Sequence, residues 1–355
     1  MKNFKKISFI IIFAVLFLLS LLRACGSKSS AGEVYVYCYG DYFDPEIVAD
    51  FEAETGIHVV QDTYDTAEEM YPVIEKHSVN YDVVCTSDYM IAKMIDKDLL
   101  SPLDKNRIKN IKNIDPKYME KSLEFDPGNT YSMPHVVGVA GIMYDKKAVG
   151  DAEIDSWEDL WDPRFKDKIV MPDSMRDDFM IALKKNGVSM NSTDPADIEK
   201  AKEDLMKQKP LVYKYANDSA RDLLANGSAS VGVVWNGEYV YTKDLNKNVE
   251  FVVPKEGSEF FIDAWVIPKA AKNKKNAEMW LDYLARPDVA KKNFDYLYYT
   301  TPNRAAYKLI PQKYLSDPAV FPSADVLARC ETLKMPDDAG NKRFSDAWKE
   351  VKLEK

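Results

Sequence analysis

The sequence predicts an α/β protein built on parallel sheets, and three observations support this fold class. Strand-like apolar runs alternate with amphipathic helical runs along the chain, without a repeat period. Several of the strand-like runs are apolar on both faces, as is typical of parallel strands that helices cover on both sides. The chain has 355 residues, of which 46% are apolar, enough for one large core or two moderate ones.

The first α/β unit begins with the strand-like run Val34–Tyr39 (VYVYCY). Asp44 follows as a helix N-cap, and Pro45 takes the first helical position. Apolar residues then recur at helical spacing until Gly56, which is expected to end the helix. The chain resumes a strand at Ile57–Val60.

The same pattern repeats further along the chain. Further strands, each leading into a helix, are expected at Tyr81–Cys85, Lys168–Met171 and Ser230–Val234. Asp194-Pro195 is a second Asp-Pro start of a helix. The segment Asn276–Phe294 is expected to be helical with a break at Pro287, because proline cannot continue the hydrogen-bond ladder.

Residues 1–24 are typical of an export signal. A basic start precedes the apolar stretch Ile7–Leu22, whose 16 residues are short for a spanning helix, which needs about 20. The segment Leu22–Ser27 (LRACGS) is similar to a bacterial lipobox except for the charged Arg23, so Cys25 is expected to be lipidated. An uncleaved membrane anchor is the alternative. Residues 25–32 are expected to be a flexible tether.

The charge of the chain disfavours nucleic acid as a partner. The sequence has 48 basic and 57 acidic residues, a net charge of −9. The first 24 residues contain four basic residues and no acid, so the rest of the chain has a net charge of −13. Such an acidic body repels phosphates and anionic lipid and attracts cationic partners.

The cysteines and histidines do not form a recognisable metal or catalytic motif. Besides Cys25, the cysteines are Cys38, Cys85 and Cys330, and none lies in a CxxC pair. A bridge between Cys38 and Cys85 and a role as small buried hydrophobes both remain open. The three histidines do not pair at metal-ligand spacing, which disfavours a hydrolase with a histidine base.

Aromatic and acidic residues follow the expected strands directly, at Tyr39–Tyr42, Ser87–Tyr89, Asp173–Asp177 and Trp235–Glu238. In open α/β sheets, ligands bind at the carboxyl ends of the strands. Each of these residues also has an alternative interpretation. Ser87, Asp173 and Ser174 could serve only as helix caps, and the aromatic residues could be ordinary half-buried side chains without a ligand.

A cleft with aromatic walls and several acids suits a long, flexible cation. Aromatic rings attract ammonium groups by about 0.5–2 kcal/mol each and cover methylene segments. Carboxylates in a closed cleft attract a cation far more strongly than they do in water. A sugar would require a mixture of donors and acceptors, and an amino acid would require an arginine, for which Arg176 is the candidate.

Longer segments of the chain resemble the spermidine/putrescine-binding proteins of bacterial polyamine ABC importers. The resemblance extends over essentially the whole chain after the export signal. The matching segments are FEAETGIHV, TYDTAEEMY, YDVVCTSDYMIAKM, SWEDLWDPRFKDKI, GVVWNGEYV, VVPKEGSEFFIDAWVIPKAAKN, ARPDVAK and YYTTPNRAA.

The resemblance implies a two-lobed periplasmic-binding-protein-like fold of type II, with parallel-sheet lobes joined by hinge strands. Crossings between lobes are expected near Val137, Phe261 and Tyr307. The first lobe then comprises residues 33–137 and 262–307, and the second comprises 138–261 and 308–355. The implied protein is an exported, lipid-anchored monomer on the outer face of the cell membrane. It binds a polyamine and delivers it to ABC permease subunits, without enzymatic activity, a cofactor or a bound metal.

The resemblance also implies a set of ligand-binding residues, with Asp263 as the acid expected to pair with a terminal amine. The set comprises Tyr39, Asp41, Tyr42, Ser87, Tyr89, Ser174, Asp177, Trp235, Phe261, Asp263 and Tyr299. Three positions depart from the family pattern: Ser174 stands where some relatives have Asp, Phe261 where they have Trp, and Gly40 where they have Thr. The loss of one acid leaves the preference for a triamine open, and Asp173 or Glu238 is a candidate to replace it. The C-terminal segment Glu331–Gly340 aligns poorly and is assigned no ligand contact.

Two other functions are compatible with parts of this pattern. A ferric-iron-binding protein of the same fold would use adjacent tyrosines such as Tyr298 and Tyr299. An extracellular glycosidase would require two carboxyl groups about 5–10 Å apart, one of them with a raised pKa.

Overall fold

The computed structural model describes residues 32–40, 42–217 and 219–353. The strands in this part of the chain are β1 (Glu33–Tyr39), β2 (His58–Tyr64), β3 (Val83–Ser87), β4 (Leu100–Ser101), β5 (Ser132–Asp145), β6 (Ile169–Met171), β7 (Val212–Tyr215), β8 (Val231–Trp235), β9 (Val249–Val252) and β10 (Phe260–Pro268). The α-helices are α2 (Pro45–Thr55), α3 (Ala67–Glu75), α4 (Asp88–Asp96), α5 (Pro116–Ser122), α6 (Lys146–Val149), α7 (Met175–Lys185), α8 (Pro195–Gln208), α9 (Ala220–Ala225), α10 (Gly237–Leu245), α11 (Lys274–Leu284), α12 (Pro287–Leu297), α13 (Gln312–Leu315), α14 (Ala324–Ala328) and α15 (Asp338–Leu353). Short 3₁₀ turns are η1 (Lys109–Asn113), η2 (Trp157–Trp161), η3 (Pro163–Phe165), η4 (Lys209–Leu211) and η5 (Arg304–Lys308).

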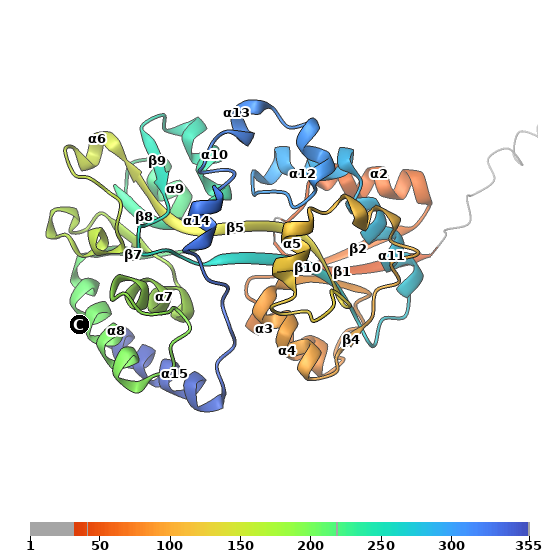
Figure 1. The fold of residues 1–355 in the computed structure, drawn as a ribbon, viewed down its shortest axis with the longest axis horizontal. Coiled ribbons are helices and arrows are strands. Elements are labelled where there is room, and N and C mark those ends of the chain that lie inside the picture. The colour runs from red at the N-terminus through yellow and green to blue at the C-terminus, as the bar shows by residue number, and fades with distance from the viewer. Residues whose placement is uncertain (1–31, 41, 218, 354–355) are drawn as a thin grey trace, which may run out of the picture.

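The strands form two parallel groups that two long strands connect. The strand order is β2-β1-β3-β10-β5-β8-β6-β7, with β4 added beside β10 and β9 beside β5. Within β2-β1-β3 and within β8-β6-β7 the pairing is parallel, whereas β10 and β5 run antiparallel to their neighbours. Figure 1 shows β5 and β10 extending across the middle of the molecule between two lobes. We call the lobe built on β2-β1-β3 the first lobe and the lobe built on β8-β6-β7 the second.

The strand β5 changes its partner where it passes from one lobe to the other. Its residues up to Val139 pair with β10, and its residues from Ala140 onward pair with β8. The α/β fold class and the two-lobed arrangement expected from the sequence are confirmed. The connecting strands are antiparallel, a feature that local apolar patterns do not reveal.

The helix ends that the sequence predicted are confirmed in the structure. Asp44 caps α2, and its carboxylate accepts a hydrogen bond from the N–H of Glu46 at 2.8 Å. Gly56 ends this helix with a φ of 72°, a left-handed conformation that glycine adopts at little cost. The predicted break at Pro287 separates α11 from α12.

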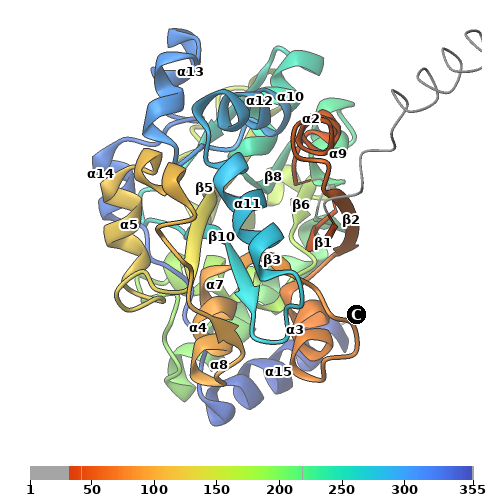
Figure 2. The same cartoon turned by 90° about the vertical axis from the view of Figure 1, so that its right-hand side faces the viewer.

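Helices cover both faces of the first lobe's sheet. Val34, Val36 and Cys38 of β1 pack in one cluster with Trp280 of α11. The opposite face, which includes Tyr37, packs against apolar residues of α3 and α4. Figure 2 shows α2, α11 and α12 on one side of these strands and α3 and α4 on the other. The alternation of side chains along β1 therefore explains why this run is apolar on both faces.

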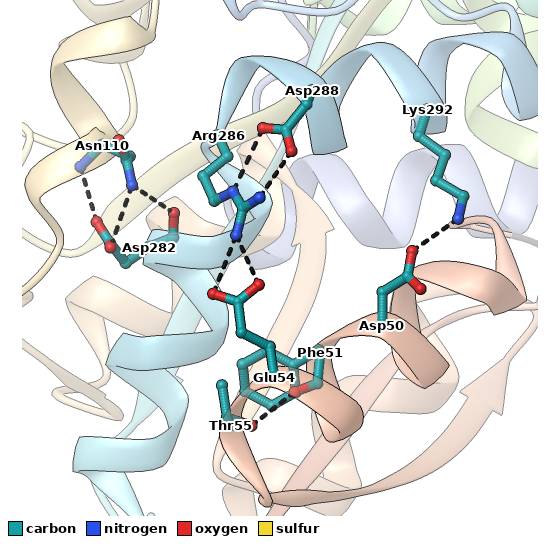
Figure 3. Close-up of polar contacts among 9 residues, drawn as sticks. All are labelled: Asp50, Phe51, Glu54, Thr55, Asn110, Asp282, Arg286, Asp288 and Lys292. Carbon is teal, nitrogen blue, oxygen red and sulfur yellow. Dashed lines mark hydrogen bonds and ion pairs between the residues drawn. The ribbon is translucent and has the colours of Figure 1, made fainter.

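A network of ion pairs joins α12 to α2 (Figure 3). The Nη1 atom of Arg286 pairs with the Glu54 carboxylate at 2.9 Å, and its Nη2 atom pairs with the Asp288 carboxylate at 2.7 Å. Lys292, one turn further along α12, pairs with Asp50 at 2.8 Å. Exposed pairs contribute about 0–1 kcal/mol each, so the network fixes the position of α12 more than it stabilises the fold.

The three cysteines that the structure describes, Cys38, Cys85 and Cys330, are buried and have free thiols. Of the two alternatives for Cys38 and Cys85, the structure therefore contains small buried hydrophobes and no bridge. Burial raises the pKa of the Cys38 thiol to about 12, which makes it unreactive at neutral pH.

The predicted export signal, residues 1–24, lies outside the described residues. So do residues 25–31 of the predicted tether, which include the predicted lipidation site Cys25. Among the helices of the described ranges, none combines the length and the apolar character that a membrane span requires.

Candidate functional site

The ends of strands from both lobes meet beside the connecting strands. In the first lobe, Ser87 at the end of β3 lies opposite Asp263 of β10. In the second lobe, Trp235 at the end of β8 lies opposite Ala140 of β5. Because Asp263 and Ala140 are on the two connecting strands, the polar residues that follow the strands face the junction of the lobes.

Two tyrosines and an aspartate form the wall on the first lobe. The Tyr42 hydroxyl donates a hydrogen bond to Oδ2 of Asp263. The ring of Tyr39 lies 5.0 Å from the ring of Tyr42, measured between centroids. Burial raises the pKa of Asp263 to about 7, against a partial lowering by the Tyr42 hydrogen bond. Burial and then the Asp263 charge raise the pKa of both tyrosines, so both stay neutral.

A half-buried histidine supports this wall from behind. A ring nitrogen of His135, on β5, lies 3.2 Å from the carbonyl oxygen of Tyr42, and the side-chain amide of Asn293 lies 3.4 Å from the same nitrogen. Burial lowers the pKa of His135 to about 4, so the ring is neutral at pH 7. His135 therefore positions Tyr42 without adding charge to the site.

The turn from β3 into α4 brings a tyrosine to the boundary between the lobes. The ring of Tyr89 packs against apolar clusters of both lobes. Its hydroxyl donates to Oε1 of Glu68 on α3 at 3.1 Å. The neighbouring Asp88 is buried and accepts hydrogen bonds from the N–H groups of Tyr89 and Ile262, at 2.7 and 3.4 Å. Burial raises the pKa of Asp88 to about 8.

The start of α7 forms the wall on the second lobe. Ser174 is the N-cap of this helix, and its Oγ accepts a hydrogen bond from the N–H of Asp177 at 3.5 Å. Burial raises the pKa of Asp177, whereas Ser174 and Arg176 oppose that rise. The guanidinium of Arg176 lies over the Phe344 ring, with Cζ 4.6 Å from the ring centroid. Burial lowers the pKa of Arg176, whereas the charges of Asp177, Glu259 and Glu68 oppose that fall, so the guanidinium faces acids of both lobes.

The Trp235-Asn236-Gly237 segment holds the hinge together. The buried Asn236 side chain accepts from the N–H of Val139 at 3.1 Å and donates to the carbonyl oxygens of Ala319 and Val320. A Cβ on Gly237 would lie 2.4 Å from the ring of Tyr299, so glycine is needed for this approach. The Tyr299 hydroxyl donates to Glu238 at 3.1 Å, and its ring meets Phe261 edge-on at 6.1 Å.

Sequence reasoning did not identify Glu259, which the structure places among the predicted site residues. This glutamate precedes β10, is 7% exposed and accepts a hydrogen bond from the Trp235 indole. Burial, followed by repulsion from Asp177, Asp88 and Asp263, raises its pKa well above its usual range. The sequence did contain a signal for Glu259: it is an acid directly before the apolar run of β10. A residue in that position lies at the end of a connecting strand, close to the hinge.

The structure separates several residues that the sequence had grouped. Asp173 points outward and pairs with Lys352 at 2.7 Å, and Glu238 pairs with Arg221 at 2.9 Å. Asp41 lies outside the described residues. The remaining predicted ligand-binding residues lie along the junction of the lobes, with Ser174 acting there as a helix cap.

Chemically, the junction combines buried and half-buried carboxylates with aromatic rings. Each carboxylate has a raised pKa because it lies in a poorly hydrated place or beside another acid. A bound cation would reverse this effect, since opposite charge stabilises the ionised form. Tyrosine and tryptophan faces add cation–π attraction of about 0.5–2 kcal/mol each. The arrangement is suited to binding a cation that has apolar segments.

Comparison with known proteins gives a consistent result. Residues 46–322 match the family model described as bacterial extracellular solute-binding protein. The chain is 35% identical over 314 residues to a spermidine/putrescine-binding periplasmic protein of Salmonella typhimurium, covering 88% of this chain and 90% of that protein. It is 32% identical to the putrescine-binding periplasmic protein PotF of Escherichia coli, with 90% and 91% covered.

Two solved structures are also similar to this chain. One is the spermidine/putrescine substrate-binding protein PotD of Streptococcus pneumoniae, with a TM-score of 0.81 and 34% identity over 91% of this chain and 99% of that one. The other is a spermidine/putrescine ABC transporter protein of Listeria monocytogenes, with a TM-score of 0.86, 34% identity and the same coverage.

Proposed function

We propose, from the premise that this chain belongs to the spermidine/putrescine-binding group of bacterial extracellular solute-binding proteins, that it captures a polyamine between its two lobes and delivers it to an ABC permease. The observation that supports this most directly is the set of junction acids, the buried Glu259 and Asp263 and the half-buried Asp177, beside the aromatic residues Tyr42 and Trp235.

The ligand chemistry follows from these residues. Ammonium groups neutralise the carboxylates, which are costly to ionise in a dry cleft while they lack a counter-charge. The rings of Tyr39, Tyr42 and Trp235 cover the methylene segments between the ammonium groups. The ligand is held by charge and stacking, and the protein performs no chemistry on it.

The iron-binding alternative is not favoured. Relatives with 32–35% identity are named for spermidine or putrescine. Tyr298 and Tyr299 also point to different places: the ring of Tyr298 packs on Tyr314 at 5.5 Å, whereas Tyr299 meets Phe261 and Glu238. Among the described residues, no group of three or more His, Cys, Asp or Glu side chains is placed to hold a metal ion.

Ligand binding is proposed to close the two lobes. We assign residues 33–137 and 262–307 to the first lobe and residues 138–261 and 308–355 to the second. The change of partner along β5 between Val139 and Ala140 supports the first of these boundaries. A ligand that touches Asp263 on one side and Asp177 on the other has most of its contacts only in the closed form, so it shifts the population toward that form.

The protein is exported, like the solute-binding proteins of its family. We propose further that lipid on Cys25 anchors it, as a monomer, to the outer face of the cell membrane. The lipobox-like segment around Cys25 supports this anchor. Two or more acyl chains anchor a protein stably, whereas one does so only marginally.

Native mass spectrometry of the full chain, purified without added ligand, tests the proposed ligand class. The expected mass increment is that of a polyamine, and addition of spermidine or putrescine should raise the melting temperature. Ligand at 100 times its dissociation constant should stabilise the fold by about 2.7 kcal/mol. Stabilisation by lysine or maltose, with no response to either polyamine, would contradict the proposal.

A further inference from the structure

The number of acids in the cleft bears on which polyamine it prefers. Ser174 occupies a position where some relatives have an acid, and its oxygen caps α7. Neither expected replacement lies free in the cleft. Asp173 has a side chain that is 57% exposed and pairs with Lys352, on the last helix, at 2.7 Å. Glu238 is tied to Arg221 and to the Tyr299 hydroxyl.

Glu259 is held at the junction of the lobes from several directions. Its carbonyl oxygen accepts from the N–H of Ala140 at 3.3 Å. The residues on either side of it exchange hydrogen bonds with Glu331: Phe260 N–H donates to the Glu331 carbonyl at 2.8 Å, and Glu331 N–H donates to the Ser258 carbonyl at 2.9 Å. The Trp235 indole donates to its carboxylate. Both the backbone and the side chain of Glu259 are therefore fixed between the lobes.

Two other buried acids contribute little charge to the junction. Asp178, beside Asp177 on α7, is fully buried and its oxygens have no hydrogen-bond partner among the described residues, and burial raises its pKa well above its usual range, which favours the neutral acid. Asp88 is 1% exposed and both of its oxygens accept backbone hydrogen bonds, so it serves the turn between β3 and α4.

The acids that act on Arg176 are, in decreasing order, Asp177, Glu259 and Glu68, so its cation offsets one negative charge of this group. Counting formal charges, the acids Asp177, Glu259, Glu68 and Asp263 against the single cation of Arg176 leave three negative charges for the ligand.

We propose that Glu259 is the third anionic ligand contact of the cleft and that it gives this protein a preference for a linear triamine over a diamine. This inference rests on the proposed function. A triamine such as spermidine supplies three ammonium groups for three carboxylates. A diamine such as putrescine leaves one carboxylate without a counter-charge, which must then stay protonated or be ionised at a cost.

Titration calorimetry on the full chain at pH 8 and fixed ionic strength tests this assignment. The variant Glu259→Gln keeps the size of the side chain and an oxygen that can accept from Trp235, but removes the charge. Its dissociation constant for spermidine should rise at least about 10-fold, while that for putrescine changes less than about threefold. The matched control Asp173→Asn should leave both constants unchanged, because Asp173 is outside the cleft.

The outcomes separate the two proposals. The preference is measured as the ratio of the dissociation constant for putrescine to that for spermidine. If this ratio is unchanged in Glu259→Gln, or falls equally in Asp173→Asn, the role of Glu259 alone is overturned. Failure of the wild-type chain to bind either amine overturns the proposed function itself. A melting curve for each variant checks folding. If Glu259→Gln does not fold, the shorter Glu259→Asp provides the test, because it moves the charge away from the ligand without removing it. This variant should still lower the ratio of dissociation constants, and a ratio equal to that of the wild type overturns the assignment.

Discussion

The Tyr42 hydroxyl donates a hydrogen bond to the Asp263 carboxylate, although the two residues are 221 positions apart in the sequence. Tyr42 follows β1, and Asp263 lies within β10, two strands further along the sheet. The bond favours the ionised carboxylate, whereas burial favours the protonated one, and the resulting pKa of Asp263 is about 7. This acid is therefore near its midpoint at neutral pH while the cleft is empty.

Replacement of Asp263 by Ala should weaken polyamine binding by about 30-fold or more. The variant leaves a ligand ammonium buried without its counter-charge, which typically costs about 2–5 kcal/mol. Titration calorimetry with spermidine and putrescine measures the change. A loss smaller than threefold would show that Asp263 does not contact an ammonium group.

Replacement of Tyr42 by Phe should weaken binding at pH 7 more than at pH 9. The hydroxyl lowers the pKa of Asp263, so its removal raises that pKa and leaves less of the ionised acid at neutral pH. The midpoint of the dependence of affinity on pH should shift upward. The same midpoint as in the wild type, measured by calorimetry across pH 6–9, would contradict this role for Tyr42.

The ligand-free protein should become less stable as the pH rises from about 4 to about 8. Asp263 has a folded-state pKa of about 7 and Asp88 of about 8, both raised by burial from the ordinary value of 3.8. In that range the folded state keeps protons that the unfolded state has released, so the free energy of unfolding falls with rising pH. Urea unfolding at pH 5 and pH 8 measures the fall.

The variant Asp263→Asn provides the control for that experiment, since it cannot titrate and should show a smaller fall. Saturating polyamine should also reduce the fall, because bound ammonium groups stabilise the ionised acids. A stability that rises from pH 5 to pH 8 in the ligand-free wild type would argue against protonated acids in the empty cleft.

Replacement of Asn236 by Ala should destabilise the fold by about 2–4 kcal/mol. The side chain is fully buried, and its loss removes the partners of the Val139 N–H and of two carbonyl oxygens in the 319–320 segment. Urea denaturation gives the change. Asn248→Ala, at an exposed asparagine, is the matched control and should cost much less. If both variants lower the free energy of unfolding equally, Asn236 does not stabilise the hinge.

Replacement of Cys25 by Ser should release the protein from the membrane or leave an unprocessed precursor. A serine at this position has no thiol to accept a diacylglyceryl group. Membrane fractionation and the mass of the product measure both effects. Normal processing together with unchanged membrane attachment of the variant would exclude lipidation at Cys25.

The sequence alone determined the alternation of strands and helices, because the signals for it are local. Asp44, Pro45 and Gly56 set the ends of one helix through their own backbone and side-chain preferences. The strand-end positions of Tyr39, Ser87 and Trp235 follow from where each apolar run stops. Their location at one edge of the sheets was therefore predictable, whereas their individual ligand contacts were implied by the family resemblance and remain to be tested.

The tertiary structure alone decided which acids face the cleft. Asp173 and Glu259 are both acids next to a strand, yet Lys352 holds Asp173 on the surface, while Trp235 and the backbone of Glu331 hold Glu259 inside. In each case the partner lies far away in the sequence, and the choice depends on how distant segments pack. Likewise, Tyr298 and Tyr299 are adjacent in the chain but are turned to different neighbours, because the left-handed conformation of Tyr298 ends α12 between them. A one-dimensional pattern identifies charges near strand ends, but the direction of a side chain is set by the partners that folding brings to it.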